Sequence, residues 1–578
     1  MSSDRTVSAR QAMPMLISRD IAVPMRDGSI LRANLFRPDD GRRYPVIVSS
    51  TPYGKDVHVR DSFPPVWGTV EARYPEILEA SSGAHMIWEC PDPEIWVGNG
   101  YAMLQVDVRG TGKSAGYMQP NSPAEADDGY DAIEWAVAQD WCDGSAGMLG
   151  LGYITCTNWR IAALKPAGLK AAVFCQGTHD FYRDRIRNDG IYSSGFNSIW
   201  WKVQGLANQH GNPDSPFPDM YTGGVATGPE RLSPAELAAN RIDYLEELLA
   251  HPLLDDWFKA RIANLAKIDV PALVIANWGG LGLQLRGTVT GWTGLGSRHK
   301  WLKIESGSYF FTFFTPERVA FLKKFFDCHL KGIENGWTSV PRVEVTIRST
   351  DDGVAGLVKS TDWPLPELQW RRLYFDLQSR ALVETPPTAA TTAGYTPGSN
   401  EVTLSTEPLP ETVTLAGPLA AKLWLSCETE DTDLFLTVRI IAPDGKDVSF
   451  FAAVDPHSAP AQGWLRASQR KLDPKRSSEY LLCHAHDERQ PLRAGEIYEV
   501  DVSIWPTGIE IPAGHRLALV IGGADFTWPP ESGKRPSVFV HNEPRDRPAA
   551  VYEGKVTLHS GVKHPAYIAL PCMPKPTK

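Results

Sequence analysis

The order of hydrophobic patterns constrains the fold of this chain more than any other feature. Short apolar runs alternate with segments of helical periodicity from about residue 21 to residue 345. The runs include PVIVSSTPYG from residue 45, YAMLQVDVR from residue 101, AAVFC from residue 171 and ALVIA from residue 272. Strands that alternate with helices at this spacing predict a parallel sheet covered by helices. The sequence therefore predicts an α/β core in two parts, residues 21–180 and 266–345.

Two segments depart from this alternation. Between residues 181 and 265 the apolar residues follow helical spacing without clear strands, which predicts a helical cap inserted into the core. From residue 346 to 578 short alternating strands are separated by Pro, Gly and Asp turns, which is typical of an all-β domain, and we expect a jelly roll. Residues 1–20 are expected to form an N-terminal arm.

The composition excludes several classes of protein. With 58 Lys and Arg against 68 Asp and Glu, the chain has a formal charge of −10 and no basic block. Binding to nucleic acid or to an anionic membrane is therefore not expected. The N-terminus lacks an apolar signal segment, and no run approaches 18 apolar residues. The eight cysteines show no metal-ligand spacing, which favours free thiols in the cytoplasm and no metal site.

Several stretches resemble one known family. RDGSILRANLFRP, STPYGKD, VDVRGTGKSAG, FLKKFFDCHLKG and PTGIEIPAGHRLALVI are similar to framework segments of the cocaine-esterase and X-Pro dipeptidyl-peptidase family of serine hydrolases. The resemblance runs from about residue 20 to residue 570. It implies an α/β-hydrolase core, a small-molecule substrate and a possible homo-oligomer. The Gly-rich loop at residues 110–116 matches a turn of this family and lacks phosphate-loop spacing, so we expect no nucleotide cofactor.

The residues that correspond to the family's Ser-His-Asp triad are altered. The family carries its nucleophile on a sharp strand-to-helix turn, and here that turn reads Gly150-Leu151-Gly152-Tyr153. Gly152 stands at the serine position, Tyr309 at the histidine position and Gly280 at the acid position. An engineered Ser→Gly change would leave the histidine in place, so the resemblance favours natural loss of the triad.

The residues that correspond to the family's oxyanion hole are retained in this sequence. The resemblance implies an oxyanion hole formed by the backbone N–H of Tyr153 and the hydroxyl of Tyr53, both of which are present. Such donors stabilise an enolate as well as a tetrahedral intermediate. The alternative is that Tyr53 and Tyr153 persist only as packing residues.

Other side chains are candidates for chemistry. His179 follows a strand and is a candidate acid or base, or else a polar anchor of the cap. Tyr309 is a candidate general acid, or a buried tyrosine beside a Phe cluster. Cys156, one helical turn after Gly152, is a candidate substitute nucleophile. The chain has 19 Trp, and we expect an aromatic-lined pocket whose substrate-binding residues are Gly152, Phe181, Tyr182, Trp200, Trp201, Trp278, Gln284 and Phe310.

These observations lead to three functional hypotheses. The first is an enzyme that binds a hydrophobic carbonyl compound at Tyr53 and Tyr153 and catalyses a non-hydrolytic step, such as cyclisation, isomerisation, or C–C bond formation or cleavage, in specialised metabolism. The second is an esterase or amidase that uses a relocated nucleophile or an activated water. The third is a catalytically inactive binding or scaffold protein.

Overall fold

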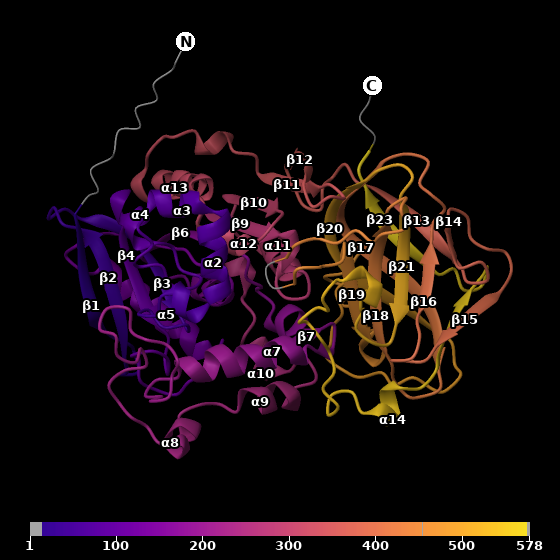
Figure 1. Ribbon diagram of the computed structural model, residues 1–578, viewed down its shortest axis with the longest axis horizontal. Coiled ribbons are helices and arrows are strands. Elements are labelled where there is room, and N and C mark those ends of the chain that lie inside the picture. Colours follow the sequence, from indigo (N-terminus) through magenta and orange to yellow (C-terminus); the bar gives the residue numbers. More distant parts are fainter. Residues whose placement is uncertain (1–13, 453–454, 575–578) are drawn as a thin grey trace, which may run out of the picture.

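The computed structural model describes residues 14–452 and 455–574, apart from the side chains of residues 309 and 312. Its N-terminal half is built on one sheet with the strand order β1–β2–β4–β3–β5–β6–β9–β10–β11–β12 (Figure 1). The ladders from β4 to β11 are parallel, and β1, β2 and β12 pair antiparallel at the edges. The strands are β1 (Met15–Pro24), β2 (Ile30–Pro38), β3 (Tyr44–Thr51), β4 (Ala102–Asp107), β5 (Cys142–Met148), β6 (Leu169–Cys175), β9 (Ala272–Asn277), β10 (Lys300–Glu305), β11 (Val343–Arg348) and β12 (Val354–Ser360).

Helices cover both faces of this sheet. α5, α6 and α11 contribute to one apolar cluster, whereas α4 and α13 contribute to another. Because both faces are covered, every residue of β4 and of β9 is buried, as is usual in parallel sheets. The helices of the core are α1 (Val59–Ser62), α2 (Pro64–Arg73), α3 (Pro75–Ala80), α4 (Pro93–Gly98), α5 (Pro123–Val137), α6 (Tyr153–Leu164), α11 (Leu285–Gly294), α12 (Tyr309–Thr312) and α13 (Pro316–Lys331).

The cap lies between β6 and β9 in the sequence and covers one end of the sheet (Figure 1). The segment was expected to be helical throughout, but it also contains the two-stranded hairpin β7–β8. Its elements are η1 (Phe181–Ile186), β7 (Arg187–Asn188), β8 (Ile191–Tyr192), α7 (Ser194–Trp200), η2 (Trp201–Gly205), η3 (Leu206–Asn208), α8 (Pro234–Ala239), α9 (Tyr244–Ala250), α10 (Asp256–Lys259) and η4 (Leu265–Lys267).

The C-terminal unit is a β-rich barrel. Its ladders connect β20, β17, β23, β13, β14, β16, β21, β18 and β19, and a bridge from β19 to β20 closes the ring. The jelly-roll topology stays a prediction. The elements are β13 (Gln369–Asp376), β14 (Ala381–Val383), β15 (Thr391–Tyr395), β16 (Val402–Ser405), β17 (Val413–Cys427), β18 (Asp433–Ile441), β19 (Ala461–Arg466), β20 (Tyr498–Ile511), β21 (Arg516–Gly522), α14 (Ala549–Tyr552), β22 (Val556–Ser560) and β23 (Tyr567–Cys572).

The observed elements differ from the expected boundaries at two places. The N-terminal arm expected over residues 1–20 ends in β1, which pairs with β2, while residues 1–13 lie outside the described part of the chain. The boundary at residue 346 falls inside β11, and β12 also extends the core sheet. The strand β5 ends at Met148, because Gly150 and Gly152 form the turn into α6.

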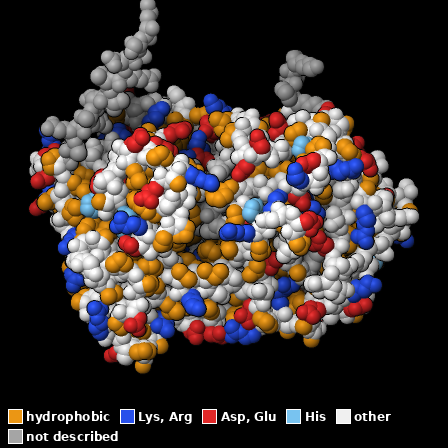
Figure 2. Space-filling model, viewed as in Figure 1, with side chains coloured by type: hydrophobic (Ala, Val, Ile, Leu, Met, Phe, Trp, Pro, Cys, Tyr) orange, Lys and Arg blue, Asp and Glu red, His pale blue; other side chains and the backbone are white. Residues whose placement is uncertain are grey.

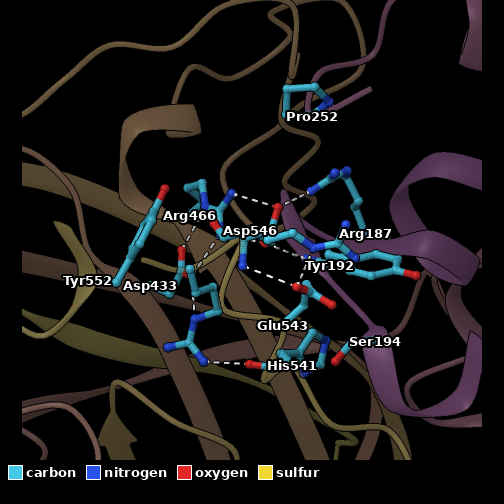
Figure 3. Close-up of polar contacts among 12 residues, drawn as sticks. Arg187, Tyr192, Ser194, Pro252, Asp433, Arg466, His541, Glu543, Asp546 and Tyr552 are labelled. Carbon is cyan, nitrogen blue, oxygen red and sulfur yellow. Dashed lines mark hydrogen bonds and ion pairs between the residues drawn. The ribbon is translucent and has the colours of Figure 1, made fainter. Parts of the chain in front are cut away.

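A buried ion-pair network joins the cap to the barrel (Figure 3). Asp546 of the barrel accepts from Arg187 of β7 at 2.6 Å and from Arg466 of β19 at 2.8 Å. Arg466 also pairs with Asp433 at 2.9 Å, and Asp433 accepts from Arg547 at 2.9 Å. Because these charges satisfy one another in a buried interface, removal of one partner leaves another uncompensated. The network therefore couples the position of the cap to the barrel.

The surface carries charges of both signs, and the cysteines of the described chain form no disulfide. Acidic and basic side chains are interspersed on the face seen in Figure 2. None of the described helices has the length and apolar character needed to cross a membrane. All eight cysteines are free thiols, and Cys90, Cys142, Cys156, Cys175 and Cys427 are buried.

Candidate active site

The turn between β5 and α6 has the backbone of a nucleophile elbow. Gly152 has φ 58° and ψ −119°, a conformation that side-chain-bearing residues rarely adopt. α6 begins at Tyr153, so the first N–H groups of this helix have no intrahelical acceptor and carry the positive end of the helix dipole. Gly152 itself offers no nucleophile, but the turn still presents backbone donors.

The carboxylate of Glu89 lies at this turn. Its Oε2 accepts a hydrogen bond from the N–H of Tyr153 at 2.8 Å, which is the donor expected for an oxyanion hole. A Cβ built on Gly152 would overlap the Glu89 carboxylate, so this group fills the space of a side chain at position 152. The Glu89 carbonyl also accepts from the N–H of Leu151 at 3.0 Å. Glu89 has φ 60°, which is unusual for a residue other than glycine and is common at functional sites.

Burial changes the ionisation of Glu89. Loss of solvent raises the pKa of its carboxyl group to about 8, and hydrogen bonds from the backbone of Tyr153, the charge of Arg185 and the hydroxyl of Tyr53 only partly oppose this effect. A carboxyl group with a pKa near neutrality exchanges protons readily at physiological pH. Glu89 therefore has the position and the ionisation of a general acid or base.

Tyr53 follows β3 and lies beside Tyr153. The two rings meet edge to face with centroids 6.1 Å apart, and the Tyr53 hydroxyl accepts from Nε1 of Trp200 at 3.2 Å. Burial raises the pKa of Tyr53 well above its usual value, so its hydroxyl keeps its proton and acts as a donor. The hydroxyl of Tyr153 is not available in this way, because it donates to Glu125 at 2.7 Å.

A cavity of about 220 Å³ extends from Glu89 toward the cap. Its walls are mainly apolar, and the exposed side chains of Ile199 and Val203 lie at the cap, where Figure 2 shows apolar side chains gathered on the surface. The Oε1 atom of Gln284 is buried without a hydrogen-bond partner among the described residues. The lining residues are Tyr53, Phe63, Trp88, Glu89, Tyr153, Cys156, Arg185, Phe196, Ile199, Trp200, Val203, Gln204, Leu283, Gln284, Phe310 and Val538.

Six of the residues singled out in the sequence lie together around this cavity, namely Tyr53, Tyr153, Cys156, Trp200, Gln284 and Phe310. Gly152 forms the turn at its base. Tyr309 begins α12, but its side chain lies outside the described part of the structure, so its role stays a prediction.

Four aromatic residues expected to line the pocket lie elsewhere. Trp278 is buried and donates to the carbonyl of Thr346, which positions it between the core sheet and the barrel. Phe181 and Tyr182 pack against Phe258 within the cap. Trp201 packs on Tyr244 and is not among the residues that line the cavity. Aromatic composition alone does not distinguish a core ring from a pocket ring, which explains these corrections.

His179, expected as an acid or base of the site, borders a different cavity of about 510 Å³ between the core and the barrel. Its Nε2 lies 3.2 Å from Oγ1 of Thr290, and burial lowers its pKa to about 4. It is therefore neutral at physiological pH and separate from the Glu89 cavity.

Cys156 lines the Glu89 cavity, but its thiol is poorly suited to attack. Burial raises the pKa of Cys156 to about 12, so the reactive thiolate is scarce at neutral pH. Without an adjacent histidine among the cavity-lining residues, no base activates it. The geometry thus favours Glu89 over Cys156 as the reacting group.

Among the described residues, one cluster has the composition of a metal site. Ligand atoms of Asp189, His484 and His486 lie within 4.8 Å of one another, and all three residues are buried. The other carboxylate oxygen of Asp189 already pairs with Arg286 at 2.5 Å. Since a neighbouring guanidinium compensates this carboxylate, the cluster is explained as part of an ion-paired network.

The sequence pattern did not indicate Glu89, Arg185 or Val538 as site residues. Glu89 lies in an irregular segment between α3 and α4, and Val538 comes from a loop of the barrel. The one sequence signal for Glu89 is an isolated acid between Trp88 and Cys90. Only the tertiary fold brings these segments to the turn at Gly152.

Comparison with known proteins agrees with this architecture. Residues 27–308 match the model of the X-Pro dipeptidyl-peptidase (S15 family), and residues 335–569 match that of the X-Pro dipeptidyl-peptidase C-terminal non-catalytic domain. The chain is 24% identical to a cocaine esterase of Rhodococcus sp. (strain MB1 Bresler), covering 96% of this chain and 98% of that protein. It is 22% identical to a putative serine esterase of Mycobacterium bovis, covering 87% and 90% of the two chains.

Solved structures show the same fold. A CocE/NonD family hydrolase from Staphylococcus aureus superposes with a TM-score of 0.82 at 28% identity, covering 96% of this chain and 94% of that chain. An alpha-amino acid ester hydrolase has a TM-score of 0.66 at 16% identity, covering 99% of each chain, and supports the fold alone.

Proposed function

Since the two matched models together assign the chain to the X-Pro dipeptidyl-peptidase (S15) family of hydrolases, we propose that it is an esterase- or amidase-type hydrolase. In place of a serine nucleophile, it uses Glu89 as a general base that activates a water molecule. The substrate is a mainly apolar carbonyl compound bound in the cavity between Glu89 and the cap. The observation that carries this proposal is the Glu89 carboxylate at the Gly152 turn, bonded to the N–H of Tyr153 at 2.8 Å.

The proposed reaction is a direct attack by water. Ionised Glu89 takes a proton from the water as its oxygen attacks the substrate carbonyl carbon. The carbonyl π electrons move to the oxygen, which the Tyr53 hydroxyl stabilises by donating a hydrogen bond. The tetrahedral intermediate then expels the alcohol or amine, which receives the proton from Glu89. The products are an acid and an alcohol or amine, and Glu89 returns to its ionised form.

The proposal includes loss of the Ser-His-Asp triad. Gly152 and Gly280 have no side chains at the positions that the family resemblance gives to the nucleophile and the acid. Glu89, which comes from the segment between α3 and α4, supplies proton transfer at the elbow. The N–H of Tyr153 donates a hydrogen bond to the Glu89 carboxylate and holds it in place. In the family, the corresponding N–H is expected to stabilise the oxyanion, whereas here it positions the base.

The decisive experiment replaces Glu89 by Gln and measures hydrolysis of 4-nitrophenyl butyrate. We expect kcat/KM to fall at least about 100-fold, as for loss of a general base. In the natural protein the rate should rise with pH toward an apparent pKa near 8, because the ionised carboxylate is the active form. Glu125→Gln is the matched control, since Glu125 is also buried with a pKa raised to about 7 but does not line the cavity.

An isotope experiment separates this mechanism from covalent catalysis. After a single turnover in ¹⁸O-labelled water, a general base leaves Glu89 unlabelled. Attack by the carboxylate itself forms an anhydride with the substrate acyl group, and water that opens this anhydride at the Glu89 carbonyl carbon places ¹⁸O in Glu89. Unchanged hydrolysis in Glu89→Gln, or label in Glu89, would contradict the proposed role.

A non-hydrolytic step is the second candidate. The absence of a side chain at Gly152 favours it, because no covalent acyl intermediate can form there. Glu89 would take a proton from the carbon beside the carbonyl, and Tyr53 would stabilise the enolate. Deuterium exchange at that carbon without hydrolysis would support this candidate. If neither exchange nor hydrolysis occurs with any carbonyl probe, the chain acts as a binding protein.

A further inference from the structure

We propose that the substrate carries a carboxylate in addition to its reacting carbonyl, and that Arg185 of the cap binds this carboxylate. The inference rests on the proposed function only in taking the Glu89 cavity as the substrate site. It names a substrate class, an apolar compound with an anionic end, that the hydrolase assignment leaves open.

Arg185 is a buried cation without a carboxylate partner in the part of the chain that the structure describes. It lies in η1, its residue is only 4% exposed, and its side chain borders the cavity. Its guanidinium carbon lies 4.9 Å from the ring centroid of Phe196 and 5.1 Å from that of Trp200. No carboxylate oxygen of the described residues lies within 4.0 Å of it. Aromatic faces therefore hold this side chain in place without neutralising it.

The two neighbouring arginines, unlike Arg185, each pair with a carboxylate. Arg183, two residues earlier, pairs with Asp180 at 2.7 Å, and Arg187, two residues later, pairs with Asp546 at 2.6 Å. The same short segment thus places three arginines, two of which are satisfied by carboxylates of the chain. Arg185 is the one that faces the cavity, which indicates that its anionic partner comes from outside.

The charge of the cavity supports this interpretation. Glu89 is the one acidic residue among the lining residues, and it is more than 4.0 Å from the Arg185 guanidinium. Burial raises the pKa of Glu89 to about 8, so much of it is neutral at physiological pH. An unpaired buried guanidinium costs free energy, and a bidentate carboxylate removes that cost with strong hydrogen bonds.

The positions of the groups define the ligand. Arg185 belongs to the cap, whereas Glu89 and Tyr53 come from core loops, and apolar residues such as Phe63, Trp88 and Leu283 line the remaining wall. A ligand that spans the cavity places its carbonyl at Tyr53 and its carboxylate at Arg185. The cap then serves as the substrate-selecting element.

Binding of 4-phenylbutyrate and of its neutral isostere 4-phenylbutanamide, measured by isothermal titration calorimetry, tests the proposal. We expect the anion to bind at least about tenfold more tightly, since each charge-assisted pair contributes strongly in a buried site. Arg185→Met should abolish this preference, and Arg185→Lys should keep part of it. Arg231→Met on the surface is the control. Equal affinities, or an anion preference that survives in Arg185→Met, would overturn the proposal.

A second measurement needs no variant. In the natural protein, kcat/KM for the mono-4-nitrophenyl ester of glutaric acid should exceed that for 4-nitrophenyl valerate by about tenfold, because the first carries a free carboxylate. The binding experiment does not depend on catalysis. If the chain hydrolyses no ester but prefers the anion, the proposed function fails and Arg185 binding stands. If it hydrolyses neutral esters as well as anionic ones, only this inference fails.

Discussion

The Glu89 carboxylate occupies the space into which a side chain at position 152 would project. A Cβ on Gly152 would overlap both carboxylate oxygens, and the N–H of Tyr153 donates to Glu89 at 2.8 Å. Gly152 and Glu89 are therefore complementary. Gly152 has no side chain, and the carboxylate of Glu89 occupies the space that a side chain at this position would need.

Restoring serine at the elbow should not restore a serine esterase. Gly152→Ser adds a side chain at φ 58° and displaces Glu89, which should lower the free energy of unfolding by about 2–4 kcal/mol. Chemical denaturation measures this. Gly41→Ser is the control, because Gly41 also has positive φ, 72°, but nothing lies within 4 Å of its Cβ position. The double variant Gly152→Ser/Glu89→Ala should recover part of the loss, and additive effects would contradict the predicted overlap.

Glu89 should make stability depend on pH. Its folded-state pKa of about 8 lies above the ordinary 4.5, so the folded protein holds the proton more strongly than the unfolded chain. The contribution of Glu89 to stability is then fully present below pH 4.5 and is lost as pH rises through 8, by on the order of 4–5 kcal/mol. Melting temperatures measured from pH 5 to pH 9 should fall in the natural protein relative to Glu89→Gln. A difference in melting temperature between the two proteins that stays constant across this pH range would contradict the raised pKa of Glu89.

Cys156 should be dispensable for catalysis. Because burial raises the pKa of its thiol to about 12, iodoacetamide should modify Cys156 much more slowly than the partly exposed Cys328. Peptide mass spectrometry follows the two sites in one sample. Cys156→Ala should retain hydrolysis within a few-fold. Rapid labelling of Cys156 together with loss of activity in the alanine variant would identify it as the nucleophile instead.

Tyr53→Phe tests the remaining oxyanion donor. Loss of its hydroxyl should lower kcat by about 10²–10³-fold with a smaller change in KM, since the bond strengthens as negative charge develops on the substrate oxygen. Steady-state kinetics with 4-nitrophenyl butyrate measure both constants. Trp200→Phe, which removes the indole that donates to this hydroxyl at 3.2 Å, should have a smaller effect. Wild-type kinetics in Tyr53→Phe would instead support a packing role.

The ion pairs between cap and barrel should contribute strongly to stability. Asp546→Asn leaves Arg187 and Arg466 without a shared anion and should cost about 3–5 kcal/mol. Despite burial, these two guanidinium groups lower the pKa of Asp546, so its contribution is present above pH 4 and is lost as pH falls further. Thermal unfolding from pH 2 to pH 7 checks both effects. The control is Arg545→Gln, which breaks an exposed pair with Glu246 and should leave the melting temperature unchanged.

The alternation of apolar runs and helical segments determined the α/β core, because a parallel sheet buried on both faces needs continuous apolar strands separated by helices. Departures from this alternation predicted the cap and the β-rich C-terminal part, and the glycines at positions 150 and 152 predicted the sharp turn between β5 and α6. Family motifs also placed Tyr53 and the N–H of Tyr153 at this turn, where the structure has them.

The identity of the reacting groups was decided only by the tertiary structure. Glu89, Arg185 and Val538 come from an irregular core segment, the cap and the barrel, and their meeting depends on long-range packing. Likewise, Trp200 lines the cavity while Trp201 packs into the cap, although the two are adjacent. Sequence patterns report which residues prefer to be buried, whereas the direction in which a buried side chain points, and the pKa that results, follow from what the folded chain places around it.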